Sequence, residues 1–253
     1  MEAKEKEILN ELISGTKCQF VIPVFQRNYD WRVKDCEKLF DDIEDLAKDA
    51  NSPDRKHFMG AFVCKFNKFV DTSFNQYILI DGQQRLTSIT LLLKALHDYL
   101  KKFGDKYEEM RSEIKETYLI NKFAKDSNLK LKLKPNQVDN DSFTKLMDDE
   151  DVSGIETNII RNYNKFYEWL GKMHVSIEDF YNALQRLEGV VVFLYDTDNP
   201  QVIFESLNST GLELTDVDLI RNYLLMNLKA DYQEKLYKDY WLKIEGLLQE
   251  NFI

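Results

Sequence analysis

A group of polar side chains stands where an apolar segment of the chain meets a helical one. Residues 76–80, Gln-Tyr-Ile-Leu-Ile, lead into Asp81-Gly82-Gln83-Gln84-Arg85, and an apolar pattern with helical spacing follows at once. A strand that feeds a helix presents free backbone N–H groups and the positive end of the helix at one point, which favours an anion. Gly82 allows close approach of the backbone, and Arg85 can donate two hydrogen bonds to a phosphate.

Asp81 is the unusual member of this group, because a bare carboxylate repels phosphate. Its presence fits if it holds Mg²⁺, orients a water molecule or pairs with Arg85. A structural alternative also stands: Asp81 caps the helix and Arg85 only satisfies Asp81. Taken alone, a short glycine–arginine pattern favours this structural interpretation, since such patterns are common.

Two other segments mix polar and aromatic residues. Residues 22–31, Ile-Pro-Val-Phe-Gln-Arg-Asn-Tyr-Asp-Trp, contain groups that can stack on a base and bind phosphate, or that can anchor the following helix. Residues 204–222 contain a turn signal, Asn-Ser-Thr-Gly, and a capping-box pattern formed by Thr215 and Asp218. Capping explains part of this polarity, but it does not explain Glu205 and Asn208 before the turn, or Arg221 and Asn222 after it.

Composition limits the class of protein. The chain has 253 residues, a net charge of −10 and 43% hydrophobic residues, which predicts a soluble globular protein with a substantial core. The acidic balance argues against a domain whose main role is to grip nucleic acid. No apolar run approaches the roughly 18–20 residues that span a bilayer, and the charged start is read as an amphipathic helix, so we expect no membrane contact and a cytoplasmic location.

Cysteine and histidine usage gives no sign of a metal centre. The three cysteines lack a C-x-x-C spacing, and the three histidines are far apart in the chain. We therefore expect buried thiols in a reducing compartment, with no zinc site and no histidine-based triad.

The periodicity predicts an α+β fold. Strands are expected at 18–25, 57–66, 76–80, 129–134 and 189–196, and helices at 5–14, 33–48, 156–173, after Arg85 and after Ser176. The C-terminal part is expected to hold helices near 200–208, 216–229 and 232–250. Strands therefore stand on both sides of a mainly helical block. This predicts a first part at 1–102, a helical insertion at 103–187 and a closing part at 188–253.

The three polar segments, in this order, resemble the N-terminal domain of GmrSD-type proteins of restriction and phage-defence systems. The resemblance covers roughly residues 10–230 and includes the whole Asp-Gly-Gln-Gln-Arg motif. It implies a ParB/sulfiredoxin-like fold, with a small mixed sheet surrounded by helices. It also implies a domain that binds and hydrolyses a nucleoside triphosphate (GTP, ATP or CTP not distinguished) with Mg²⁺, beside an HNH-type nuclease domain that we do not find in this chain.

The resemblance also assigns roles to residues. It implies catalytic roles for Asp81, Gln84 and Arg85, and nucleotide binding by Gln26, Arg27, Gly82, Gln83, Thr87, Asn208, Gly211 and Arg221. It implies Mg²⁺ ligation by Asp81, Glu205 and Asn208, and recognition of modified DNA by Tyr29 and Trp31.

Three functions follow as alternatives. The first is a Mg²⁺-dependent nucleoside triphosphatase that regulates a DNA-targeting defence protein, with DNA contacted through a nuclease partner and with oligomerisation open. The second is a sensor of nucleotide or modified DNA without turnover, and the third is a protein-interaction scaffold. Sulfiredoxin-type phosphoryl chemistry is a minor alternative, since it calls for a reactive cysteine in an activating setting.

Overall fold

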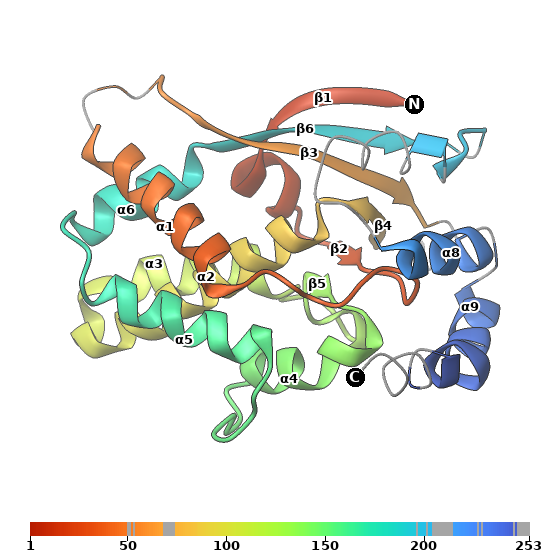
Figure 1. Cartoon of the computed structure of the whole chain (residues 1–253). Coiled ribbons are helices and arrows are strands. Elements are labelled where there is room, and N and C mark those ends of the chain that lie inside the picture. The colour runs from red at the N-terminus through yellow and green to blue at the C-terminus, as the bar shows by residue number, and fades with distance from the viewer. Residues whose placement is uncertain are drawn as a thin grey trace.

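The computed structural model contains one mixed sheet and a large helical layer (Figure 1). It describes residues 1–49, 52, 54–67, 74–195, 197–200, 202–203, 215–226, 228, 230–244 and 246. The strands are β1 (Glu2–Glu7), β2 (Cys18–Val21), β3 (His57–Phe66), β4 (Asn75–Asp81), β5 (Leu133–Lys134) and β6 (Leu187–Leu194). The helices are α1 (Val33–Lys48), α2 (Gln83–Leu100), α3 (Glu108–Glu113), α4 (Gln137–Met147), α5 (Asn158–Leu170), α6 (Ile177–Gln185), α8 (Asp216–Leu225) and α9 (Ala230–Leu236). Short helical turns lie at Ile8–Ile13, Lys101–Tyr107, Ile114–Leu119, Ser127–Leu129 and Tyr237–Trp241.

The sheet is assembled from distant parts of the chain. Its strand order is β1-β6-β3-β4-β2-β5. The β1–β6 and β3–β4 pairs are antiparallel, whereas β6–β3, β4–β2 and β2–β5 are parallel. The helical block at 103–187 therefore contributes one edge strand, β5, and the closing part contributes β6, so all three parts of the chain build the same sheet. This confirms the α+β class.

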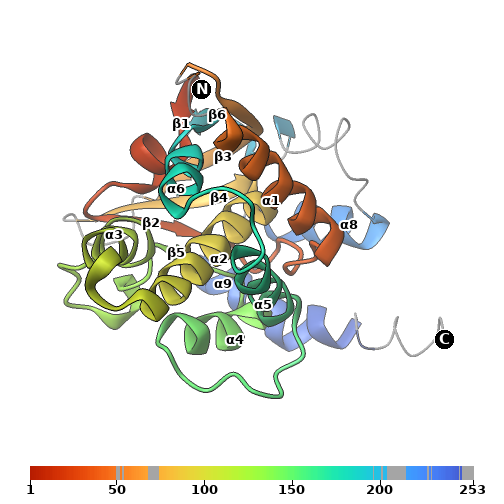
Figure 2. The same cartoon turned by 90° about the vertical axis from the view of Figure 1, so that its left-hand side faces the viewer.

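Alternate side chains of the central strands enter two different cores. Phe62, Leu79 and Val191 face the larger core, which contains the buried faces of α1, α2, α5 and α6. Val63 and Ile80, each next in sequence to one of these, face a smaller core with Leu225 of α8 and with Trp241. Figure 2 shows α2 in the middle of the helical layer, with α1 and α5 beside it. The sheet is thus covered by a thick helical layer on one face and by α8 on the other.

Most expected helices and strands are present at the expected residues. The helix expected at 33–48 is α1, and its six predicted apolar positions are all buried, namely Cys36, Leu39, Phe40, Ile43, Leu46 and Ala47. The strand expected at 57–66 is β3, and that expected at 189–196 is β6, which lies between β1 and β3. The cap predicted for Thr215 is formed, since its Oγ1 accepts from the Asp218 N–H, and Ser176 Oγ accepts in the same way from the Asp179 N–H. The helix expected near 200–208 lies largely outside the described residues.

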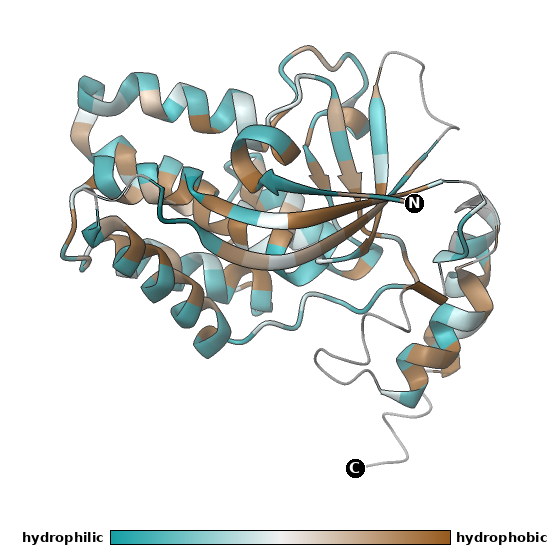
Figure 3. Ribbon diagram, turned by 90° about the horizontal axis from the view of Figure 1, so that it is seen from above, coloured by the Kyte–Doolittle hydropathy of each residue, from teal (hydrophilic) through white to brown (hydrophobic). Residues whose placement is uncertain are grey.

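The start of the chain differs from the prediction. The sequence favours an amphipathic helix over 5–14, but residues 2–7 form the edge strand β1, and only Ile8–Ile13 turn helically. Pairing with β6 overrides the helix propensity of Glu, Ala and Lys. The exposed charges of β1 suit an edge strand, because charged side chains discourage pairing with another chain. Figure 3 shows this N-terminal strand in teal beside a largely brown neighbour.

The expected strand at 129–134 is also shorter than predicted. Only Leu133 and Lys134 pair as β5, and the charged residue before them, Lys132, is 2% exposed. Its ammonium group donates to the carbonyl oxygens of Ile13 and Gly15, which end the first helical turn of the chain. Burial lowers the pKa of Lys132 to about 8. This lysine therefore closes a helix end, which alternation alone does not predict.

Candidate functional site

The Asp-Gly-Gln-Gln-Arg motif forms the turn from β4 into α2. Gly82 is the residue before the helix and has φ +90°, a region that glycine enters without strain. A Cβ at Gly82 would lie 2.5 Å from the Phe62 ring, so no side chain fits there. The sequence needs glycine at this point for two independent reasons, a left-handed backbone and contact with a buried ring.

Arg85 fastens the first turn of α2 to the neighbouring strand β3. Its guanidinium donates to the carbonyl oxygens of Met59 and Ala61 at 2.7 Å each, and to Asp81 Oδ2 at 3.2 Å. Gly60 lies between the two carbonyls with φ +90°, and a Cβ there would lie 2.1 Å from Arg85 Nη1. The β3–β6 register shifts at this place, between Phe58 and Ala61. Arg85 therefore satisfies a bulged segment whose carbonyls have turned out of the ladder.

Gln84 fastens the same turn to the segment after β2. Its Oε1 accepts from the N–H groups of Asp30 at 2.8 Å and Trp31 at 3.2 Å, and its Nε2 donates to the Asn28 carbonyl at 3.0 Å. The side chain is 7% exposed. Because both ends of the amide are occupied by backbone groups, Gln84 sets the path of residues 28–31.

The described parts of the three polar segments meet near the end of β4. Gln26 Nε2 donates to the Ile80 carbonyl at 2.9 Å, and Arg221 Nε donates to the Phe25 carbonyl at 2.8 Å. Arg221 also pairs with Asp218 on α8. Figure 1 shows the segment between β2 and α1 running out toward α8 before it returns. Residues 22–31, 81–85 and 221 thus belong to one structural unit, although these contacts are all made to the protein itself.

Tyr29 and Trp31 are placed differently from residues that read a base at the surface. Tyr29 is 5% exposed, and its phenol oxygen lies 2.7 Å from Ser88 Oγ and accepts from Asn162 at 3.1 Å. Burial raises the pKa of Tyr29 well above its usual value. Trp31 is partly buried against the main core. Tyr29 is therefore an anchor of its loop, and this structure offers its ring no open face to a DNA base.

Several polar groups at the turn stay without a partner among the described residues. Gln83 is 7% exposed, and its Oε1 is buried with no hydrogen bond in the described part of the chain. No side chain caps the first N–H groups of α2 in that part either. Arg27 lies on the neighbouring segment between Gln26 and Asn28, is half-buried, and makes no hydrogen bond or ion pair with the described residues. Thr87, in the same first turns of α2, is buried. A buried acceptor without a donor is costly, so it marks a place where a ligand or water completes the structure.

Of the three predicted Mg²⁺ ligands, only Asp81 lies among the described residues. Asp81 is about a quarter exposed, and its Oδ2 pairs with Arg85 while Oδ1 has no described partner. Glu205, Asn208 and Gly211 lie outside the described residues. Among the described residues, no three acidic, cysteine or histidine side chains gather closely enough to hold a metal ion. Mg²⁺ commonly uses one or two carboxylates and takes its other oxygens from phosphate and water, so Asp81 fits as a single ligand.

Sequence reasoning missed the residues that hold the segment 26–31 from the side of α4 and α5. Asp139 accepts from the Tyr29 N–H at 2.6 Å, and Asn136 donates to the Gln26 carbonyl at 3.3 Å and to Asn28 at 3.0 Å. Burial raises the pKa of Asp139 to about 6. A capping signal was present, since Asn136 precedes α4 and accepts from the Asp139 N–H. That signal predicts a helix start, but it cannot reveal a partner more than 100 residues away.

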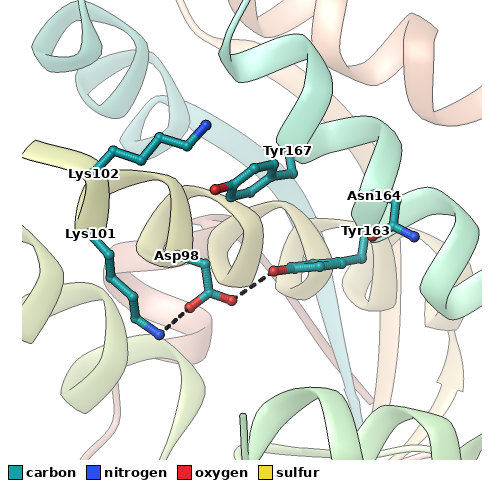
Figure 4. A pocket seen from close by; sticks show the side chains of 6 residues that line it. All are labelled: Asp98, Lys101, Lys102, Tyr163, Asn164 and Tyr167. Atoms are coloured by element: carbon teal, nitrogen blue, oxygen red, sulfur yellow. Dashed lines mark hydrogen bonds and ion pairs between the residues drawn. The ribbon is translucent and has the colours of Figure 1, made fainter. Parts of the chain in front are cut away.

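A second polar cluster lies near the C-terminal end of α2 and contains acidic, basic and tyrosine side chains of the kinds found in catalytic sites. Asp98 accepts from the Tyr163 hydroxyl at 2.8 Å and pairs with Lys94 and Lys101, beside a hollow of about 510 Å³ (Figure 4). The Lys102 ammonium lies over the rings of Tyr99 and Tyr167 at 4.7 and 4.5 Å. The hydrogen bonds of Asp98 with His97, Lys101 and Lys94 hold the pKa of its carboxyl well below the usual range, against the opposing effect of burial. The charges satisfy one another and join α2 to α5.

The cysteines do not form a reactive centre. All three are free and buried, as expected. Burial raises the pKa of the Cys18 and Cys36 thiols to about 11 and raises that of Cys64 further. Since the thiolate is the nucleophile, these values disfavour sulfiredoxin-type chemistry at these positions. Among the described residues, no helix is both long and apolar enough to cross a membrane.

Comparison with known proteins agrees with the convergence of the three segments. The uncharacterized protein MJ0686 of Methanocaldococcus jannaschii is 23% identical over 269 aligned positions, which cover 90% of this chain and 43% of the relative. This chain therefore spans less than half of the length of that protein. The family model described as the N-terminal domain of the GmrSD restriction endonuclease matches residues 6–225. The chain belongs to the GmrSD N-terminal domain family.

Proposed function

We propose that this domain binds a nucleoside triphosphate at the start of α2 and hydrolyses it with Mg²⁺, as part of a DNA-targeting restriction or phage-defence protein. The observation that carries the proposal is the uncapped N-terminus of an 18-residue helix, entered through a glycine that admits no side chain. Free N–H groups at such a helix start form an anion site.

The unpartnered groups of the turn supply the remaining contacts. Arg27 provides a guanidinium for phosphate oxygens, and the Gln83 amide oxygen accepts from a ribose hydroxyl or a bound water. Asp81 offers one oxygen for Mg²⁺ or for the attacking water. When bound, Mg²⁺ neutralises charge that develops on the phosphates. The protein's part is to position phosphate and water, which is the main source of catalysis in phosphoryl transfer.

Gln84 and Arg85 take a positioning role in this proposal. Their hydrogen bonds to backbone groups fix the turn and the loop at 28–31, so their side chains act through the geometry of α2 and Arg27. Gln26 and Arg221 act in the same way, by holding the loop against β4 and α8. Thr87, Asn208, Gly211 and Glu205 remain candidates from the family resemblance alone.

The restriction context rests on the family and on chain coverage. The family is named for a restriction endonuclease, and the relative from Methanocaldococcus jannaschii is more than twice as long as its matched part. A net charge of −10 gives this domain little general attraction for DNA. We therefore assign DNA contact and cleavage to a nuclease partner or further domain, which this domain would regulate through nucleotide turnover.

The test compares two arginines. Arg27→Ala removes the proposed phosphate contact, whereas Arg55→Ala removes an exposed arginine that pairs with Asp45 and Asp49. Calorimetric titration with GTP, ATP and CTP in the presence of Mg²⁺ should show at least about tenfold weaker binding for Arg27→Ala alone, since a charge-assisted contact is lost. Equal affinities in both variants and the wild type would contradict the assignment.

Hydrolysis needs its own measurement. Asp81→Asn should keep most of the affinity for nucleotide and lower phosphate release at least about tenfold, because the amide binds Mg²⁺ and orients water poorly. Phosphate release that is unchanged in Asp81→Asn would remove this residue from the mechanism.

A nucleotide sensor without turnover is the second candidate function. It is favoured by the hydrogen bonds of Arg85 to the Met59 and Ala61 carbonyls, which occupy the guanidinium that would otherwise stabilise a transition state. Tight binding together with no phosphate release above the buffer rate would select it.

A further inference from the structure

A second hollow opens beside the segment that follows β2. It has a volume of about 370 Å³, within the range of about 300–1,000 Å³ of small-molecule sites. It lies between residues 21–24, the start of α4 and the side of α9. Among its described lining residues, none comes from 81–85. The proposed phosphate site therefore does not account for it.

The lining combines an apolar floor with amide side chains. The floor consists of residues 21–24, Ile78 and Pro135. Six amides surround it, from Asn67, Gln76, Asn136, Gln137, Asn140 and Gln233. Lys134 is the charged residue among the described lining residues, which include no acid. In a chain with a net charge of −10, this hollow is locally cationic.

Some of these side-chain amides make hydrogen bonds within the protein, and others make none to the described residues. Gln76 donates to Gln19 at 2.8 Å, and Asn136 caps α4, so both are committed. Gln137 and Asn140 make no side-chain hydrogen bond to any described residue. They stand three residues apart on α4 and are therefore neighbours on one helix face.

Gln233 brings a third amide from the opposite wall. Its Nε2 donates to the carbonyl oxygens of Met226 and Leu228, which fixes the amide plane and leaves Oε1 without a described donor. The hollow thus presents open donors and acceptors on α4 and an oriented acceptor on α9, with an apolar surface between them.

We propose that this hollow binds a nucleobase. A base needs an apolar surface for its face and adjacent donors and acceptors for its edge, and Asn and Gln amides pair with base edges through two hydrogen bonds at once. Lys134 at the rim suits the phosphate that a nucleotide carries. The base comes either from a free nucleotide or from single-stranded DNA, since both present the same chemistry.

The test is an NMR titration that follows the side-chain amide signals of the lining residues. The ¹⁵N-labelled chain is titrated with adenosine, guanosine, cytidine and thymidine, and separately with a ten-nucleotide single-stranded DNA of mixed sequence. Side-chain amide signals of Gln137, Asn140 and Gln233 should shift with a common Kd. Asn140→Leu and Gln137→Leu should each raise that Kd about fivefold or more, the effect of losing a paired base contact.

Controls separate the base contact from folding and from the phosphate site. Asn164→Leu replaces an exposed amide on α5 and should leave the Kd unchanged. Asn140→Asp keeps the shape of the side chain and should weaken binding of the same probe, because it replaces donors by a charge. Arg27→Ala should leave nucleoside binding unchanged, since nucleosides lack phosphate, so this proposal can fail or hold independently of the proposed triphosphatase.

The two sources of the base give different results. Saturable shifts with nucleosides identify a free nucleotide, and shifts with the oligonucleotide alone identify DNA; both support the base site. Absence of shifts with every probe, or unchanged affinity in both leucine variants, would overturn it.

Discussion

Gln83 and Gln84 are neighbours in the first turn of α2 and are buried to the same degree, yet their side-chain amides differ in their hydrogen bonds. Each is 7% exposed. Gln84 makes three hydrogen bonds to the backbone of residues 28–31, whereas the Gln83 amide oxygen has no partner in the described part of the chain. Within one five-residue motif, Gln84 therefore positions the chain, whereas Gln83 keeps an acceptor that a ligand can use.

The two arginines of the site show the same division. The Arg85 guanidinium donates hydrogen bonds to the Met59 and Ala61 carbonyls and to Asp81. Arg27 is half-buried, and its guanidinium makes no hydrogen bond or ion pair with the described residues. An arginine that already satisfies buried carbonyls loses those contacts if it turns to a ligand, so Arg27 is the better phosphate contact of the two.

The largest effect on stability is expected for Arg85→Ala. The substitution leaves two strand carbonyls and Asp81 without their donor, which should lower the free energy of unfolding by about 3 kcal/mol. Urea denaturation measures this loss, with Arg27→Ala as the matched control at about 0.5 kcal/mol or less. Equal losses in the two variants would remove the distinction between positioning and ligand-facing arginines.

Gln84→Leu should have the next largest effect. It leaves the N–H groups of Asp30 and Trp31 and the Asn28 carbonyl without partners, at a cost of about 2 kcal/mol. Hydrogen exchange should report the same change locally, through faster exchange of the Asp30 and Trp31 amides. Unchanged exchange at those two amides would show that Gln84 does not hold this loop.

A pH dependence of stability comes from Asp139, which holds the same loop. Its pKa of about 6 in the folded protein exceeds the unfolded value of about 3.9, so the folded state binds this proton more tightly. The resulting stabilisation is complete below pH ~4 and is lost as pH rises through about 6, by about 3 kcal/mol in total. Urea denaturation at a series of pH values should reveal this loss.

Asp139→Asn should remove that pH dependence, because the amide carries no titrating proton and its oxygen still accepts from the Tyr29 N–H. Asp141→Asn is the control, since Asp141 is exposed on the same helix and pairs only with Lys145 among the described residues. The pKa of Asp98 is lowered, so its contribution is lost below pH ~4 and does not overlap this window. A wild-type profile that is flat between pH 4 and 7 would contradict the account of Asp139.

Local patterns predicted much of this fold. The apolar spacing of α1 and the capping signals of Ser176 and Thr215 depend on neighbours within one or two turns, and these elements form as expected. Residues 2–7 form a strand against their own helical propensity because they pair with β6, nearly 190 residues away. Lys132 is buried for a similar reason, since its acceptors lie at the start of the chain.

The meeting of the polar segments was predictable from the sequence, whereas the hydrogen-bond partners of their single residues were not. Three segments with mixed polar and aromatic residues predicted one site, and residues 22–31, 81–85 and 221 do meet. Residue type alone could not separate Gln83 from Gln84 or Arg27 from Arg85, because the partners of Gln84 and Arg85 are backbone groups on other elements. The family resemblance implies recognition of DNA by Tyr29, and residue type could not reveal that its hydroxyl lies beside Ser88 Oγ and accepts from Asn162.

The smallest effect on stability, and the most direct test of this division, is expected for Gln83→Leu. Its amide oxygen loses no described hydrogen bond, so the free energy of unfolding should change by about 0.5 kcal/mol or less, or rise. Urea denaturation of Gln83→Leu and Gln84→Leu side by side compares two substitutions of the same type, at the same burial, one residue apart. We expect a loss of about 2 kcal/mol for Gln84→Leu alone. Equal losses in the two variants would contradict it.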